Sequence, residues 1–153
     1  MYKKEEIKYL ENTLENYYFL KRKEKAIEQQ VLELDYKIEN ERIVIQAMQY
    51  DCTGVSGNGC SVSVAKTKSV NYLVSKQTEL ITQRDECKRK YISLDNDNRL
   101  NDRISKLRTE SQIIINNIFQ RQLTITDVAK IEKISKQTIS NRLSKALEEM
   151  LKL

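Results

Sequence analysis

A short stretch near the C-terminal end of the chain combines basic and amide side chains in a pattern suited to reading nucleic acid. Between residues 133 and 147 there are four basic residues and no acidic one. In a DNA major groove, lysine and glutamine side chains match the edges of guanine and adenine, and asparagine can pair bidentately with adenine. The candidate base-reading residues are Lys136, Gln137, Ser140 and Asn141.

Other side chains of the same stretch suit phosphate oxygens, which supply affinity and register without sequence information. The candidate phosphate-binding residues are Lys133, Thr138, Arg142 and Lys145. An amphipathic helix with a solvated basic face is the plain structural alternative. The spacing of two capped helices around these residues favours contact with DNA.

Two short helices are expected to position these side chains. Thr126 is the expected N-cap of the first helix, whose Val128 and Ala129 face inward, and Ser135 is the expected N-cap of the second. Ile134 should anchor the turn between them. The second helix has an apolar stripe made of Ile139, Leu143, Ala146, Leu147 and Met150. This arrangement predicts a helix-turn-helix, in which the beginning of the second helix enters a major groove.

The predicted turn departs from the usual helix-turn-helix pattern at two positions. Lys133 stands where glycine is common, and Glu132 stands where a core leucine is common. Two interpretations remain open: either the first helix ends differently, or Ile131 turns inward and substitutes for the missing leucine.

The first half of the chain has the heptad spacing of a coiled coil. From residue 7 to residue 48, apolar side chains recur mostly at alternating steps of three and four, and Glu24 and Glu41 fill two stripe positions. The three glycines lie between residues 51 and 62, which predicts a turn there. A second heptad run follows, with Val70, Leu73, Gln77, Leu80, Arg84, Cys87, Tyr91 and Leu94. Gln77 and Arg84 either fix the register or lie at the edge of the seam.

These patterns predict an all-α protein with two domains. Residues 1–94 are expected to form an antiparallel coiled-coil hairpin, with its turn near residues 51–62, through which the chain dimerises. A helix break is expected at Asp95–Asn98, where Asx side chains suit the start of a new helix. Residues 95–153 should form a small helix-turn-helix domain, with the apolar run from Ile113 to Phe119 as a core helix.

The composition argues against catalysis and against a bound metal. The chain has no histidine, which excludes a catalytic triad, and its three cysteines form no CxxC pair for zinc. The glycines around Gly57 lack the Gly-Lys-Ser/Thr ending of a phosphate-binding loop. We therefore expect neither an enzyme nor a cofactor. The cysteines are expected to be free thiols, with a Cys52–Cys60 disulfide as the alternative.

The charge and hydropathy of the chain point to a cytosolic protein with a polyanionic partner. The net charge is +5 and the isoelectric point is near 9.0. No apolar stretch of about 18 residues could span a bilayer, and the N-terminus has no signal-peptide core. We expect no membrane association.

Several segments together resemble the phage late-gene transcriptional activators of the ArpU and RinA type. The resemblance covers nearly the whole chain and includes Tyr17-Tyr18, the loop Gly54–Gly57, the segment Val70–Leu73 and the helix that begins at Ser135. That last helix, with Thr138-Ile139 followed by Arg142-Leu143, is also similar to region four of bacterial sigma factors.

The resemblance implies a phage or prophage regulator in the bacterial cytoplasm, associated with the nucleoid, that binds double-stranded DNA and activates late genes with host RNA polymerase. A homodimer is expected through the N-terminal helices, because a single helix-turn-helix buries little DNA surface. The alternative is a coiled-coil adaptor whose C-terminal domain docks on a protein such as RNA polymerase.

Overall fold

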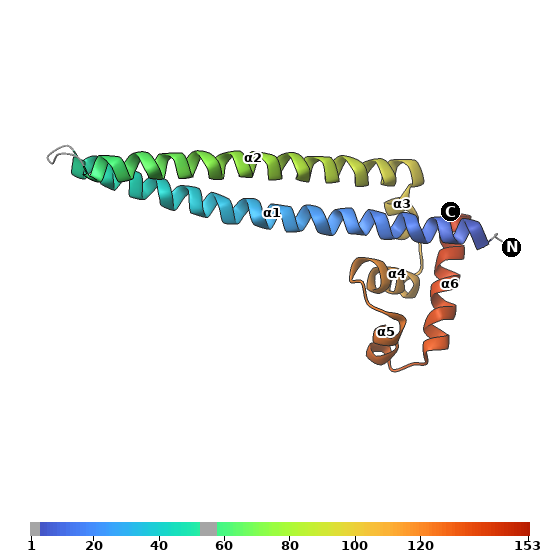
Figure 1. The fold of residues 1–153 in the computed structure, drawn as a ribbon. Coiled ribbons are helices and arrows are strands. Elements are labelled where there is room, and N and C mark those ends of the chain that lie inside the picture. Colours follow the sequence, from blue (N-terminus) through green and yellow to red (C-terminus); the bar gives the residue numbers. More distant parts are fainter. Residues whose placement is uncertain (1–3, 53–57) are drawn as a thin grey trace. The chain divides into compact units, whose positions relative to one another are not determined.

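A computed structural model describes residues 4–52 and 58–153, with side chains described for residues 4–48 and 67–153. Over these residues the chain is all-α, as the sequence predicts, and the described part contains no strand (Figure 1). The helices are α1 (Lys4–Cys52), α2 (Asn58–Asn98), α3 (Leu100–Ser105), α4 (Thr109–Ile115), the π-helix η1 (Asn116–Gln120), α5 (Ile125–Glu132) and α6 (Lys136–Lys152).

The chain divides into two compact units. The first unit combines Met1–Arg22 with Lys88–Leu153, and the second is Lys23–Cys87. Helices α1 and α2 each contribute to both units. The division does not coincide with the linear boundary expected near residue 95, because the beginning of α1 shares a hydrophobic core with the C-terminal helices.

In the second unit, the expected heptad positions whose side chains are described are all buried or half-buried. Gln77 joins the two helices, since its Nε2 donates to the Val31 carbonyl oxygen at 3.2 Å and to the Asp35 carboxylate. Arg84 instead pairs with its neighbour Asp85 at 3.3 Å. The segments of α1 and α2 therefore lie side by side in this unit (Figure 1). The buried apolar residues along them are Ile27, Val31, Leu34, Ile38, Val70 and Cys87.

Helices occupy part of the range 51–62, in which the glycine pattern predicts a turn. Helix α1 continues to Cys52 and α2 begins at Asn58, so both helices extend into that range. Residues 53–57 lie outside the described residues, as do the side chains of both cysteines in the alternative Cys52–Cys60 disulfide. Cys87 is a buried free thiol.

The helix break predicted at Asp95–Asn98 lies at Arg99 instead. Helix α2 continues through Asn98, and Arg99 adopts the left-handed conformation with φ of 52°. The Asp95 carboxylate accepts the backbone N–H of Asn101 at 2.8 Å and its side-chain amide at 3.0 Å. The Asx side chain thus does stabilise the start of a new helix, although it does so from within the preceding one.

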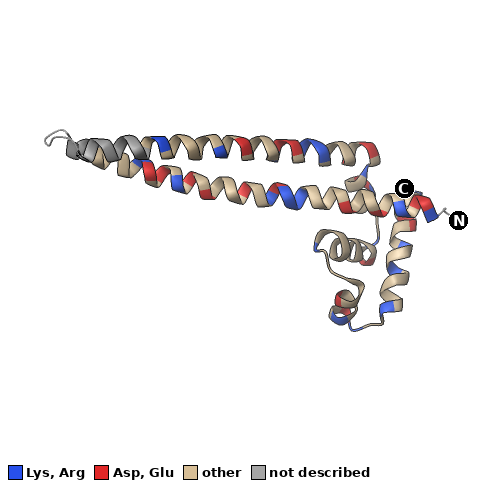
Figure 2. Cartoon of the chain, viewed as in Figure 1, with Lys and Arg blue, Asp and Glu red and all other residues tan. Residues whose placement is uncertain are grey.

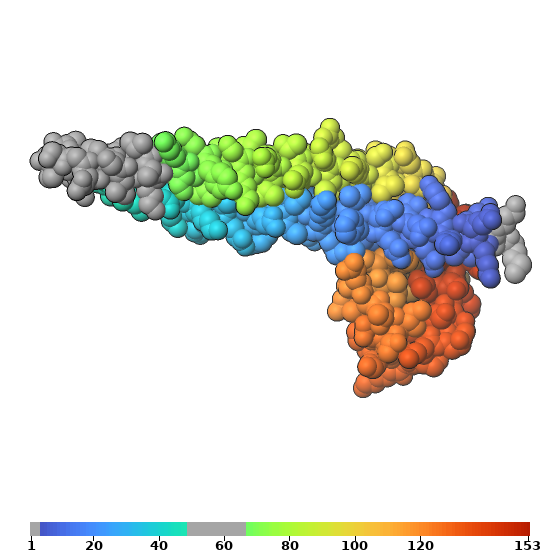
Figure 3. Space-filling view, viewed as in Figure 1, coloured from blue at the N-terminus to red at the C-terminus, as the bar shows by residue number. Residues whose placement is uncertain are grey.

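The core of the first unit joins the beginning of α1 to the C-terminal helices. Leu14 and Tyr17 of α1 are almost fully buried, as are Leu100 of α3, Ile115 of α4 and Leu147 of α6. Each such side chain stabilises the fold by about 1.5–3 kcal/mol through removal of its apolar surface from water. The atoms of α1 in this unit lie directly against those of the C-terminal helices (Figure 3).

A polar contact gives this core a specific geometry. The Tyr17 hydroxyl donates to the Asn101 Oδ1 at 3.0 Å, and its ring meets the rings of Tyr18 and Tyr91 edge to face. A buried tyrosine needs such a partner for its hydroxyl. This contact connects α1 to α3 and so to the helices that follow.

Candidate nucleic-acid interface

Helix α5 begins two residues earlier than the sequence pattern suggested. Its N-cap is Thr124, not Thr126, which lies inside the helix. The Asp127 N–H donates to the Thr124 hydroxyl at 3.1 Å, and the Thr124 N–H donates to the Asp127 carboxylate at 3.2 Å. This reciprocal capping box satisfies two backbone donors that a helix start leaves unpaired. The hydroxyl and backbone N–H of Thr124 also hold the pKa of the Asp127 carboxyl below its usual value.

The turn between α5 and α6 places a lysine where glycine is common. Lys133 ends α5 with φ of 56° and ψ of 40°, which is the left-handed conformation. The Ile134 N–H donates to the Ala129 carbonyl oxygen at 3.1 Å and closes the turn. Ile131 is 54% exposed, so the interpretation in which it replaces a core leucine is wrong. The first helix ends instead with a strained lysine, at a cost of about 1–2 kcal/mol.

Ser135 is the N-cap of α6, as predicted. Its Oγ accepts the Thr138 N–H at 3.2 Å and lies 2.8 Å from the Thr138 hydroxyl oxygen. Thr138 is half-buried and its hydroxyl already has a partner in Ser135. If Thr138 contacts a phosphate, its hydroxyl would do so while it also bonds to Ser135, the N-cap of α6.

The inner faces of α5 and α6 form the predicted apolar stripe. Val128, Ala129 and Ile139 make a small buried cluster, against which Ile134 packs from the turn. Further along α6, the stripe enters the core of the first unit, where Ala146, Leu147 and Met150 are buried and Leu143 is half-buried. Because this face is fixed inward, the opposite face of α6 is held outward.

The four candidate base-reading residues lie in the first two turns of α6. Lys136, Gln137 and Asn141 are exposed, and Ser140 is half-buried. The Gln137 Nε2 donates to the Asn141 Oδ1 at 3.1 Å. This link was not anticipated from the sequence, although residues four apart on a helix are regularly neighbours.

The basic candidates for phosphate contact remain available. Lys133 and Lys145 are exposed and Arg142 is half-buried. Among the ion pairs of the residues whose side chains are described, none involves Lys133, Arg142 or Lys145. Figure 2 shows basic positions along α6 and at the turn before it.

A further arginine lies beside two of these residues. Arg108, the residue before α4, lines a hollow of about 190 Å³ together with Arg142 and Lys145 of α6. Glu110 and Glu149 line the same hollow. Sequence reasoning missed Arg108, because it lies outside the helix-turn-helix and only the packing of α4 on α6 brings it there.

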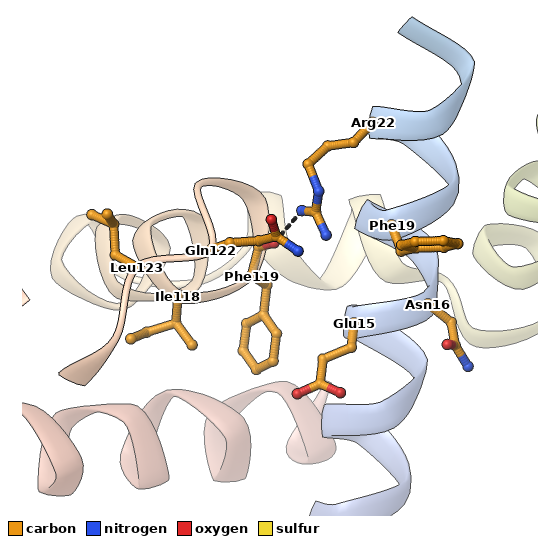
Figure 4. Close-up of a pocket in the computed structure, with 8 residues that line it drawn as sticks. All are labelled: Glu15, Asn16, Phe19, Arg22, Ile118, Phe119, Gln122 and Leu123. Atoms are coloured by element: carbon orange, nitrogen blue, oxygen red, sulfur yellow. Dashed lines mark hydrogen bonds between the residues drawn. The ribbon is translucent and has the colours of Figure 1, made fainter. Parts of the chain in front are cut away.

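The segment that leads into α5 is held by α1. The Arg22 Nη1 donates to the carbonyl oxygen of Phe119, near the end of η1, at 2.7 Å (Figure 4). It also donates to the carbonyl oxygen of Gln120, the last residue of η1, at 3.1 Å. Beside this contact is a hollow of about 460 Å³, lined by Glu15, Asn16, Phe19, Arg22, Ile118, Phe119, Gln122 and Leu123. No periodic pattern in the sequence indicated that Arg22 would meet η1.

The net positive charge of the chain is concentrated in the segment that carries this candidate interface. Residues 99–153 contain eleven Lys and Arg against six Asp and Glu, whereas residues 1–98 contain sixteen of each. The net charge of +5 therefore belongs wholly to the last 55 residues. A basic excess confined to one region is typical of proteins that bind polyanions.

Two other kinds of site receive no support from the described residues. Within them, no three Cys, Asp or Glu side chains are grouped so that they could hold a metal ion. No helix in that part of the chain combines the length and the apolar character needed to cross a membrane.

Comparisons of the chain with protein-family models, with curated proteins and with solved structures give no match. The function is therefore inferred from the side chains of α5 and α6 and from their surroundings.

Proposed function

We propose that the chain is a sequence-specific DNA-binding regulator of transcription that reads the major groove with the beginning of α6. The observation that carries this proposal is that the helix has one buried apolar face and one exposed polar face. Ile139 is fully buried, while Lys136, Gln137 and Asn141 on the other side are exposed. A capped helix that turns amide and basic side chains outward can present them to base edges.

The surrounding charge supports the same proposal. Lys133 precedes the helix, and Arg142 and Lys145 follow the base-reading residues along it. Cations on both sides of the reading positions would hold the phosphates that border the groove. Arg108 extends this basic surface beyond the helix-turn-helix.

The resemblance described above supplies the biological setting of the proposal. The chain would act in the bacterial cytoplasm as a phage or prophage late-gene activator, working with host RNA polymerase at the promoter. The proposed role consists of binding, and it requires no catalytic residue, cofactor or metal.

A homodimer through the N-terminal helices is part of the proposal. In the second unit, α1 carries exposed apolar side chains at Leu32, Tyr36 and Ile43, with exposed fractions of 57%, 76% and 56%. Their spacing of four and seven places them along one line of the helix. This line is distinct from the seam with α2, whose residues are buried, so a second copy could cover it. Sedimentation equilibrium tests the dimer, and a concentration-independent mass near 18.0 kDa would contradict it.

Selection from a random duplex library tests the proposed function. The full chain should enrich duplexes that share a short motif, because base-reading side chains discriminate between sequences. A variant with Lys136→Ala, Gln137→Ala and Asn141→Ala should still bind duplexes but enrich no motif. Recovery of random sequences by the unchanged chain would contradict sequence-specific recognition.

Binding measurements at low salt separate the proposed DNA-binding regulator from its alternative, an adaptor that docks on protein. If the chain binds no duplex at low salt and instead binds purified RNA polymerase, the adaptor replaces the DNA-binding regulator. The Arg142→Ala variant tests whether the measured duplex binding uses α6, because loss of a phosphate contact should weaken binding to all duplexes alike.

A further inference from the structure

Two side chains on the reading face of α6 are connected to each other. Gln137 and Asn141 are one helical turn apart and both are exposed. The Gln137 Nε2 donates to the Asn141 Oδ1 at 3.1 Å. The two amides therefore form a hydrogen-bonded unit rather than two independent side chains.

The direction of this bond determines what each amide can still offer. Gln137 has two side-chain N–H groups and one carbonyl oxygen, and the bond to Asn141 uses one N–H. It retains an acceptor and one donor, which is the pair that matches the N6 amino group and N7 of adenine in the major groove. One of the two lone pairs of the Asn141 oxygen is engaged by Gln137, so a bidentate adenine contact by Asn141 would have to share that oxygen with Gln137.

We infer that Gln137 reads an adenine and that Asn141 is a positioning residue that orients the Gln137 amide for it. This inference rests on the proposed function. An unrestrained glutamine loses rotamer freedom when it binds a base, and the bond to Asn141 restricts that freedom before DNA arrives. The structure thus assigns specificity at one base pair to two residues acting together.

A purely structural role for the bond makes a different prediction. Polar pairs four residues apart stabilise helices without any effect on partner choice. In that case, removal of Asn141 would change the stability of α6 and leave the preference for each base unaltered. Base preference at individual positions is therefore the measurement that distinguishes the two roles.

The experiment compares selected motifs for the full chain and four variants. These variants are Gln137→Ala, Asn141→Ala, Asn141→Asp and the double alanine variant. Gln137→Ala and Asn141→Ala should lower the preference for adenine at the same position, by about tenfold for Gln137→Ala. The double variant should lose little more than Gln137→Ala alone, because the two residues act as one unit.

The Asn141→Asp variant is the critical control. Aspartate keeps an oxygen that accepts the Gln137 N–H but lacks the amide donors of asparagine. It should retain the adenine preference at that position while its added negative charge weakens binding to every duplex. Loss of the preference in Asn141→Asp would show that Asn141 uses its own donors and would overturn the inference.

Failure of this inference is distinguishable from failure of the proposed function. If Asn141→Ala alters a position different from the one altered by Gln137→Ala, the residues read separately and the inference is wrong, but the chain remains a sequence-specific DNA-binding protein. If the unchanged chain enriches no motif, both are wrong. Thermal unfolding of each variant verifies that the helix is intact.

Discussion

The Arg22 guanidinium donates to the Phe119 carbonyl oxygen at 2.7 Å, which ties α1 to the end of η1, just before the helices of the candidate interface. We expect Arg22→Ala to destabilise the first unit by about 1–2 kcal/mol, because two carbonyl oxygens lose a charged donor. Amide hydrogen exchange should become faster around Phe119 and Leu123. Arg42→Ala, an exposed arginine on α1 in the second unit, is the matched control and should leave this exchange unaltered.

Replacement of the left-handed Lys133 by glycine should change stability and DNA binding in opposite directions. Lys133→Gly should stabilise the chain by about 1 kcal/mol, because glycine adopts positive φ without steric cost. It should also weaken DNA binding through the loss of a candidate phosphate contact. Urea unfolding and a duplex titration measure the two effects. Lys133→Ala separates them, since it removes the charge but keeps the Cβ, and a gain in stability with alanine would contradict the strain.

The position of the α5 cap can be tested with a pair of threonines. Thr124→Ala should lower the free energy of unfolding by about 1 kcal/mol, because it removes the acceptor for the Asp127 N–H. Thr126→Ala, within the helix, should change it by less than about 0.5 kcal/mol. Chemical denaturation of the two variants is the measurement. The reverse order would move the cap back to the position expected from the sequence.

The Asp127 carboxylate makes the cap dependent on pH. Its pKa in the folded chain is lowered from the ordinary value of 3.8, mainly by the hydrogen bond from Thr124. A group with a depressed folded pKa contributes stability that is full above its unfolded pKa and is lost as the pH falls through the folded value. The stability difference between the unchanged chain and Asp127→Asn should therefore be constant near neutral pH and shrink below about pH 3.8. A difference that grows on acidification would contradict this sign.

The periodic features of this fold were predictable from the sequence. The heptad residues such as Val31 and Val70 are buried, and the α6 stripe from Ile139 to Met150 faces the core, because burial follows helical spacing. Ser135 was predictable as a cap because it directly precedes the stripe of α6.

The remaining features depend on choices that spacing does not determine. Two threonines, Thr124 and Thr126, lie near the start of α5, and only the aspartate three residues after Thr124 distinguishes the true cap. The Arg22 contact joins residues 97 positions apart, and no local rule indicates which distant carbonyl an arginine meets. Arg108 reaches the candidate interface only through the packing of α4 on α6, which no local rule predicts either.

The salt dependence of duplex binding separates the candidate phosphate contacts from the base-reading residues. Arg142→Ala and Arg108→Ala should each weaken binding to all duplexes and reduce the salt slope by about 1. Gln137→Ala should leave the slope unaltered while it relaxes the sequence preference. Equal behaviour of Arg142→Ala and Gln137→Ala would contradict their separate roles.

A salt titration of the unchanged chain on duplex DNA tests the central claim most directly. If Lys133, Arg108, Arg142 and Lys145 all neutralise phosphates, the logarithm of the binding constant should fall linearly with the logarithm of salt concentration, with a slope of about −3 to −4 for each copy bound. This corresponds to a loss of about a hundredfold in affinity between 50 and 200 mM salt for each copy. Absence of duplex binding at low salt, or an affinity that does not change with salt, would contradict the proposal that α6 binds DNA.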